Sequence, residues 1–168
     1  MSISAMLLPE FDQEMATTRR VLERVPDANL AWKPHEKSMT LGRLASHLAE
    51  MPTWGVAGLT TDSLEVGNYK PLEAKSRDGI LAAFDKNVAA ARDAIEATDD
   101  AKYVTSWSLT RDGKTMLSMP KIAVVRSFVL NHVIHHRGQL SVYLRLNNVA
   151  VPSIYGPSAD EGQMGASA

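Results

Sequence analysis

The chain has 168 residues, the size of one ordinary domain, which is enough to bury a core without disulfide support. It contains no cysteine, so disulfides, thiolate catalysis and cysteine-ligated zinc are excluded, and any site must use nitrogen and oxygen ligands. The 18 basic and 19 acidic residues nearly balance, which gives no general attraction to nucleic acid or to an anionic membrane.

Targeting signals are also missing from the sequence. No apolar run approaches the 18 or so residues needed to span a bilayer, and the N-terminus lacks the basic start and cleavage pattern of a signal peptide. We therefore expect a cytoplasmic protein that binds neither nucleic acid nor membrane. A single domain is expected over residues 1–157, followed by a polar, frayed tail over 158–168.

The first part of the chain predicts two amphipathic helices. Over residues 6–24, apolar side chains recur at spacings of three and four, which is the pattern of a helix with one buried face. A connection over 29–40 follows, and Thr40 at its end can cap a second helix over 41–51. Pro52 limits how far that helix continues without a kink.

The middle of the chain predicts a crossover, a third helix and a small hairpin. Residues 60–75 form a connection long enough to cross the end of a helical bundle. Ser76 is a plausible cap for a third helix over 77–97. Residues 103–117 alternate apolar and polar side chains around an Asp-Gly pair, the strongest short signal for a β-hairpin.

Residues 120–147 predict one long helix that carries two histidines on its apolar side. The stretch begins with a proline, which suits a first helical turn. An advance of about 100° per residue places His132 and His136 in the sector expected to face the core, and Arg137 and Arg145 on the opposite, solvated side. The predicted fold is therefore all-α, a four-helix bundle with one long crossover and a minor β-hairpin between the third and fourth helices.

Three histidines are placed to face a shared interior. His132 and His136 lie one turn apart on the long helix, and His47 lies on the flank of the apolar stripe of the second helix. Three neutral imidazoles make a metal site with one position left for water or substrate, as in catalytic zinc sites, although nickel, iron(II) and manganese accept the same ligands. The alternative is a set of core histidines satisfied by hydrogen bonds, but the valine-rich face supplies few partners.

Four other polar residues are weaker candidates. His135 points about 100° away from the histidine pair, and His35 follows a proline in a charged loop, so exposure is expected for both. Gln139 and Glu50 each lie about one turn after a candidate ligand. Each can orient the neighbouring ring, and the alternative for each is a polar side chain at the surface or the bundle end.

Parts of the sequence resemble the DinB/YfiT-like superfamily of metalloenzymes. The similarity extends from Trp32 to Glu161 and is carried by LGRLASHLAEMPTW at 41–54, NHVIHHRGQLSVYLRLNNV at 131–149 and VPSIYGPSADE at 151–161. The resemblance implies an up-down-down-up four-helix bundle whose long crossover joins the second and third helices.

The resemblance also implies a divalent metal site formed by His47, His132 and His136, which match the family's three histidines. It further implies a homodimer, and a thiol among the candidate small-molecule substrates. We therefore expect a metal-dependent enzyme that holds zinc or nickel and acts as a hydrolase or a thiol-dependent transferase. The alternative is a dimeric, stress-associated metal-binding protein with no catalytic activity. The sequence assigns no general acid or base.

Overall fold

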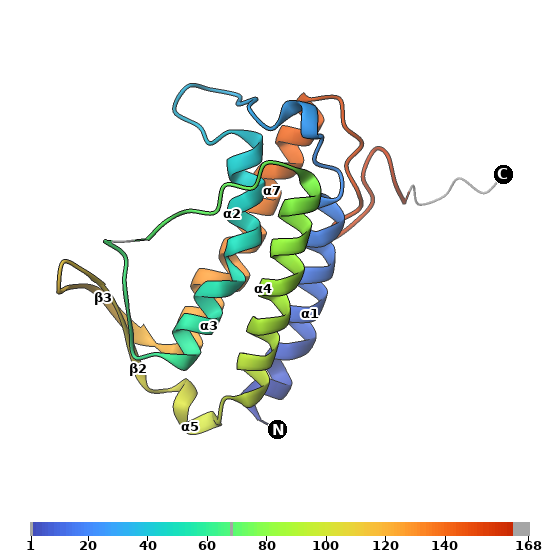
Figure 1. The fold of residues 1–168 in the computed structure, drawn as a ribbon. Coiled ribbons are helices and arrows are strands. Elements are labelled where there is room, and N and C mark those ends of the chain that lie inside the picture. The colour runs from blue at the N-terminus through green and yellow to red at the C-terminus, as the bar shows by residue number, and fades with distance from the viewer. Residues whose placement is uncertain (1, 68, 163–168) are drawn as a thin grey trace.

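The computed structural model describes residues 2–67 and 69–162, and it consists mainly of helices with a small sheet near one end (Figure 1). Within these ranges, none of the helices has the length and apolar character that a membrane crossing needs. In chain order the elements are α1 (Ile3–Leu22), η1 (Asp27–Asn29), α2 (Leu41–Glu50), α3 (Pro52–Thr60), β1 (Ser63–Glu65), α4 (Arg77–Ala97), α5 (Asp100–Tyr103), β2 (Ser106–Arg111), β3 (Lys114–Pro120), α6 (Lys121–Val124), η2 (Val125–Leu130) and α7 (Asn131–Leu146).

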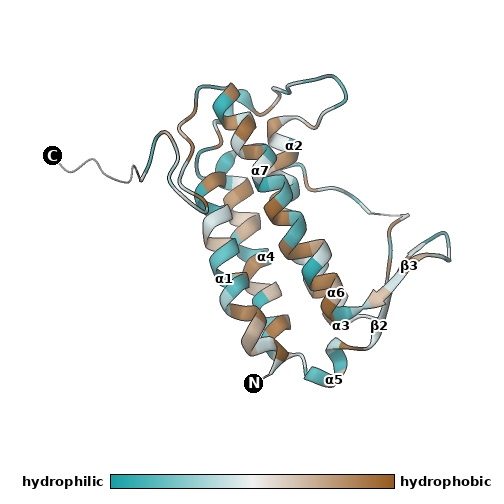
Figure 2. Cartoon of the chain, turned by 180° about the vertical axis from the view of Figure 1, so that it is seen from behind, coloured by the Kyte–Doolittle hydropathy of each residue, from teal (hydrophilic) through white to brown (hydrophobic). Residues whose placement is uncertain are grey.

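The long helices lie side by side around one core. α4 packs against α1, α2 and α3, and α7 packs against α1 and α2. Hydrophobic and hydrophilic residues follow one another along the long helices in Figure 2, such as α1, as amphipathic helices require. The buried side chains of the different helices form one apolar cluster, which includes Phe11, Leu44, Phe84, Val129 and Leu140.

The helix starts follow from local capping. The Thr40 side chain accepts a hydrogen bond from the Arg43 N–H, and the Ser76 side chain accepts one from the Gly79 N–H, which confirms both predicted caps. α4 has the predicted bounds. α1 begins earlier than predicted because the Ser2 side chain caps it.

The second predicted helix is confirmed as α2, but the chain continues into a further helix that the sequence prediction did not include. α3 begins at Pro52, where the missing N–H of proline costs nothing because the first donors of a helix have no partner. Met51, between the two helices, keeps helical backbone angles. α3 therefore continues the line of α2 and carries Trp54 along it.

The prediction of an isolated hairpin in an all-α fold is wrong, because the strands form a three-stranded sheet. β2 and β3 pair antiparallel through a turn in which Asp112 and Gly113 have positive φ, as the Asp-Gly signal indicated. β1, inside the predicted crossover, pairs with β2 in parallel. Three residues are too few to show an alternating pattern, and their partner lies far along the chain, so no local pattern predicts this strand.

The long helix over 120–147 is also interrupted. Pro120 ends β3 instead of starting the helix, and a π-helical segment, η2, separates α6 from α7. A π-helical turn takes up an extra residue, and Val125 and Leu130, five positions apart, are both buried. The direction of the side chains after η2 therefore cannot be read from a continuous α-helical rotation.

Arg137 is buried, so its predicted place on the solvated side of the helix is wrong. Its side chain is 1% exposed and forms an ion pair with the Glu14 carboxylate at 2.7 Å. It also donates to the Glu14 carbonyl oxygen at 3.1 Å and to the Tyr155 hydroxyl at 2.7 Å. Val133 and Leu144 mark the middle of the buried face of α7, and Arg137 lies only about 40° from Val133.

The chain after α7 folds back along the helices. Asp160 accepts a hydrogen bond from Arg145 at 2.5 Å, and Glu161 accepts one from Arg20 at 2.8 Å. The described part of the predicted tail is therefore held against α1 and α7. Residues 163–168 lie outside the described residues.

We expect Arg137→Met to lower the free energy of unfolding by about 3–5 kcal/mol, because it leaves the Glu14 carboxylate buried without its partner. The matched control is Arg145→Met on the same helix, whose ion pair with Asp160 is half exposed and should contribute less than about 1 kcal/mol. Urea unfolding of both variants measures the difference. Equal losses would contradict the structural role of Arg137.

Candidate metal centre

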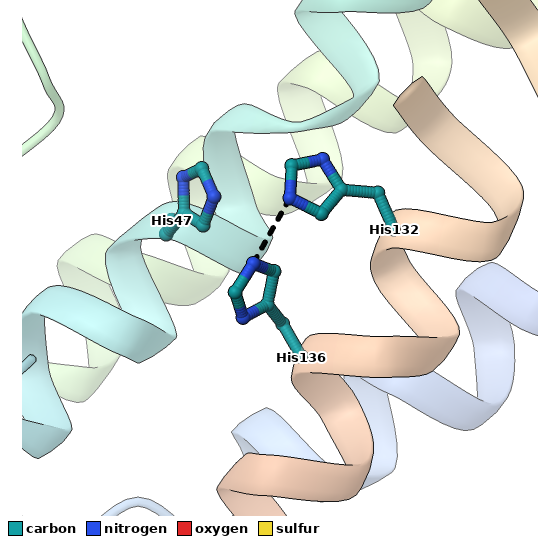
Figure 3. Close-up of side chains that lie close together, drawn as sticks. All are labelled: His47, His132 and His136. Atoms are coloured by element: carbon teal, nitrogen blue, oxygen red, sulfur yellow. Dashed lines mark hydrogen bonds between the residues drawn. The ribbon is translucent and has the colours of Figure 1, made fainter. Parts of the chain in front are cut away.

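His47, His132 and His136 meet between α2 and α7 (Figure 3). One ring nitrogen of each lies within 4.8 Å of the other two. The Nε2 atoms of His132 and His136 are 2.9 Å apart, and the His47 ring centre is 5.2 Å and 4.8 Å from theirs. The structure thus brings together the three residues that the sequence singled out.

The two helices supply the rings in different ways. His47 lies in the last turn of α2, on the flank of its buried face, and its side chain is 12% exposed. His132 and His136 are separated by one turn of α7, so both reach the same side. This side is the flank of α7 that faces α2, and not the centre of its buried face as the sequence suggested. A flank position leaves the rings close to the core but within reach of solvent.

Two of the three rings are held from behind by an oxygen atom. The Nδ1 atom of His47 lies 2.6 Å from Glu50 Oε1, and the Nδ1 atom of His136 lies 2.7 Å from Gln139 Oε1. An oxygen acceptor needs a proton on the nitrogen that faces it, so a neutral ring then has a lone pair on its other nitrogen.

The inner nitrogens converge on one point. The Nε2 atoms of His132 and His136 lie 2.9 Å apart, which is a hydrogen-bond distance that needs a proton between them (Figure 3). An ion at this point would replace that proton and accept the lone pairs of both nitrogens. The chemistry of the donor set therefore fits a cation, and three imidazole nitrogens suit a divalent first-row metal.

Glu50 is the most strongly held of these outer partners. It is buried, and besides His47 it accepts hydrogen bonds from Arg43 Nη2 at 2.7 Å and from the Leu72 N–H at 2.6 Å. Burial alone would raise its pKa, but the bonds from His47, Leu72 and Arg43 outweigh burial and lower the pKa to about 2. The carboxylate is therefore charged at neutral pH and fixes the orientation of the His47 ring.

Sequence reasoning found Glu50 and Gln139 as candidates for orienting the rings, but it did not find the residues that hold Glu50. Arg43 lies one turn before His47, and this helical spacing is the one local signal that places Arg43 near the site. The bond from the backbone of Leu72 depends on where the crossover runs, and no sequence pattern reveals that. His35 and His135 are exposed, as expected.

The histidines of α7 favour the neutral form of imidazole, which is the form that binds metals. Burial, followed by the nearby His47 charge, lowers the pKa of His132. Burial also lowers the pKa of His136 to about 4, although the bond to Gln139 opposes this. Both rings are therefore neutral at pH 7, and a metal does not have to displace protons from them.

Comparisons with known proteins agree with the sequence resemblance. The model of the DinB family matches residues 1–166. The uncharacterized protein YrdA of Bacillus subtilis (strain 168) is 25% identical over 154 residues, covering 92% of this chain and 89% of YrdA. Among solved structures, a DinB-like protein of Bacillus cereus ATCC 10987 has a TM-score of 0.72 at 24% identity, covering 92% of this chain and 98% of that one. A DinB-like protein of Bacillus subtilis, YjoA, has a TM-score of 0.69 at 16% identity, covering 94% and 99%. At these identities the two structures support the fold alone.

We expect Glu50→Gln to weaken zinc binding by roughly 10–100-fold, because the amide removes the charge behind His47 and cannot accept from Arg43, Leu72 and His47 at full strength. Titration against a chelating dye measures the affinity. Glu73→Gln, an exposed change on the crossover, is the control and should leave the affinity unchanged. Equal affinities of Glu50→Gln and the wild type would contradict the orienting role.

The stability of the metal-free protein should fall as the pH falls from about 6.5 toward 4. His136 has a pKa of about 4 in the fold and its ordinary value of 6.5 when unfolded, so in this window the unfolded chain binds more protons and is favoured. Urea unfolding at a series of pH values measures the slope. His136→Ala should flatten it, whereas His135→Ala, which alters the exposed neighbouring ring, should retain it. A slope that His136→Ala leaves unchanged would contradict this assignment.

Proposed function

Because the chain belongs to the DinB family, we propose that it is a divalent-metal-dependent enzyme whose ion is held by His47, His132 and His136. Zinc or nickel is the proposed ion, since both accept neutral imidazole ligands readily. The single observation that carries the proposal is the convergence of three imidazole nitrogens, with the outer nitrogens of His47 and His136 held by oxygen atoms.

The number of ligands supports a catalytic site more than a structural one. Structural zinc sites have four protein ligands, whereas catalytic sites have three and keep one position for water or substrate. Within the part of the chain that the structure describes, the group of side chains able to hold an ion has three members. We therefore propose that a small-molecule substrate or a water molecule takes the fourth position.

When bound, such an ion supplies Lewis acidity and lowers the pKa of a water or thiol that it contacts. The residues of this chain orient the site. Glu50 and Gln139 keep protons on the outer nitrogens of His47 and His136, which directs the inner nitrogens to one point. Glu50 is not a suitable general base, because its low pKa and its two other donors, Arg43 and the Leu72 N–H, leave it a poor proton acceptor.

We propose hydrolysis or thiol-dependent group transfer as the reaction class, because both need a nucleophile that becomes reactive near neutral pH. We also propose the up-down-down-up order of a four-helix bundle and the homodimer, both of which the family resemblance implies. A non-catalytic, stress-associated metal-binding protein is the competing function. An enzyme should turn over thiol conjugates or small esters and amides, and removal of the ion should abolish this turnover. A non-catalytic metal-binding protein should show no turnover with or without the ion.

Wild-type protein purified without an affinity tag, incubated with zinc and desalted should contain about one ion per chain. His136→Ala should lose most of it, because two imidazoles bind a divalent ion much more weakly than three. His135→Ala is the matched control, since it removes an exposed neighbouring imidazole and should retain the ion. Elemental analysis measures the content. Protein without zinc, or equal loss in both variants, would contradict the proposal.

A further inference from the structure

A group of aromatic side chains lies next to the three histidines. Trp54 of α3 contacts Tyr69 of the crossover, with ring centres 5.5 Å apart, and Phe128 of η2, with ring centres 6.0 Å apart. We call these three residues the aromatic cluster. Trp107 of β2 lies behind Phe128 at 6.2 Å. The cluster thus joins α3, η2 and the crossover, and Trp107 connects it to the sheet.

The aromatic cluster and the histidines occupy successive layers between the same two runs of helix. One run is α2 followed by α3, and the other is η2 followed by α7. Trp54 lies two turns after His47, and the helical backbone of Met51 keeps it on the same side of the α2–α3 line. Phe128 lies about one turn before His132. Along the helices the aromatic layer is therefore about 6–10 Å from the imidazole layer, a distance that a small molecule can span.

A shared pocket also links the two layers. Tyr69 and Glu50 line the same pocket, and the Glu50 carboxylate in turn accepts a hydrogen bond from His47. The ring of Tyr69 therefore lies between Trp54 and the outer partner of a metal-ligating residue. This arrangement places the cluster on the side of the site where the crossover runs.

The rings of the aromatic cluster are partly exposed to solvent. Trp107 behind them is completely buried, whereas Trp54 and Phe128 are partly exposed and Tyr69 is 39% exposed. Aromatic rings that serve only as core become buried as Trp107 does. The three rings of the cluster keep apolar surface that a ligand can cover.

We infer that the substrate carries a flat apolar group, such as a phenyl ring, which packs on Trp54, Tyr69 and Phe128 while its polar group reaches the three histidines. The inference rests on the proposed function, because it assumes that a ligand atom takes the fourth position at the ion. Aromatic surfaces bind flat apolar groups through area burial and edge-to-face or stacked contacts. Sites with a few polar groups beside an apolar wall are the usual form of small-molecule pockets.

A second aromatic pair provides a matched control. Trp32 contacts Tyr143 with ring centres 5.5 Å apart, and Tyr143 lies two turns beyond His136 in the opposite direction along α7. This pair lies farther from the histidines on α7 than Phe128 does, and no bond from it to Glu50 or to the other outer partners of the rings is found among the described residues. We therefore assign the apolar group of the substrate to the aromatic cluster and not to this pair.

Two hydroxamates that differ in one group test the inference. Both acetohydroxamate and benzohydroxamate bind an accessible zinc ion, but only the second carries a phenyl ring. We expect zinc-loaded wild-type protein to bind benzohydroxamate roughly 10-fold more tightly in calorimetric titrations, and we expect this ligand to quench tryptophan fluorescence. Trp54→Leu should remove the preference and leave acetohydroxamate binding unchanged. Trp32→Leu should retain the preference.

The outcomes separate this inference from the function on which it rests. If neither hydroxamate binds zinc-loaded protein, the open position is refuted, and the inference falls with it. If both bind equally, or if Trp32→Leu removes the preference instead, the open position stands and the aromatic cluster is refuted as the subsite. Phe128→Leu, which conserves much of the packing volume, gives a second test with the same expected loss of preference if Trp54→Leu does not fold.

Discussion

The rotation of α7 about its own axis is the constraint on which the candidate site depends. Two consecutive residues of this helix must face different neighbours, since His136 turns to His47 on α2 and Arg137 turns to Glu14 on α1. Their side chains leave the helix about 100° apart, so only a narrow range of rotations satisfies both. A buried guanidinium without its carboxylate is strongly unfavourable, and the Arg137–Glu14 pair therefore selects the rotation that brings His132 and His136 to α2.

The histidine site reduces the stability of the fold as the pH falls. Burial lowers the pKa of His132 and lowers the pKa of His136 to about 4, so protonation of these rings favours the unfolded chain. Sites under functional constraint commonly reduce stability in this way. A cation that binds the folded chain and not the unfolded one restores that stability in proportion to the logarithm of its concentration over its dissociation constant. Any metal ion that the three histidines bind would therefore stabilise the fold.

Local patterns predicted much of the fold and all three histidines. The Thr40 and Ser76 caps and the apolar periodicity of α2 and α4 depend on neighbours within one or two turns, and the one-turn spacing of His132 and His136 is equally local. The missed features depend on distant parts of the chain. β1 needs β2 as its partner, and Arg137 reads as a solvated residue until the Glu14 carboxylate of another helix is placed beside it. The π-helical η2 also shifts the face of α7, which a constant rotation of about 100° cannot reproduce.

The small sheet and the crossover contribute directly to the geometry of the site. β1 attaches the start of the crossover to β2, and β2 supplies Trp107, which supports Phe128 from behind. Within the described residues the Trp107 Nε1 atom has no hydrogen-bond partner, so the contribution of this side chain is packing. Farther along the crossover, the Leu72 N–H bonds Glu50, whose carboxylate orients His47, and Tyr69 lines the same pocket as Glu50. The segment that contributes Tyr69 to the aromatic cluster therefore also holds the carboxylate that orients His47.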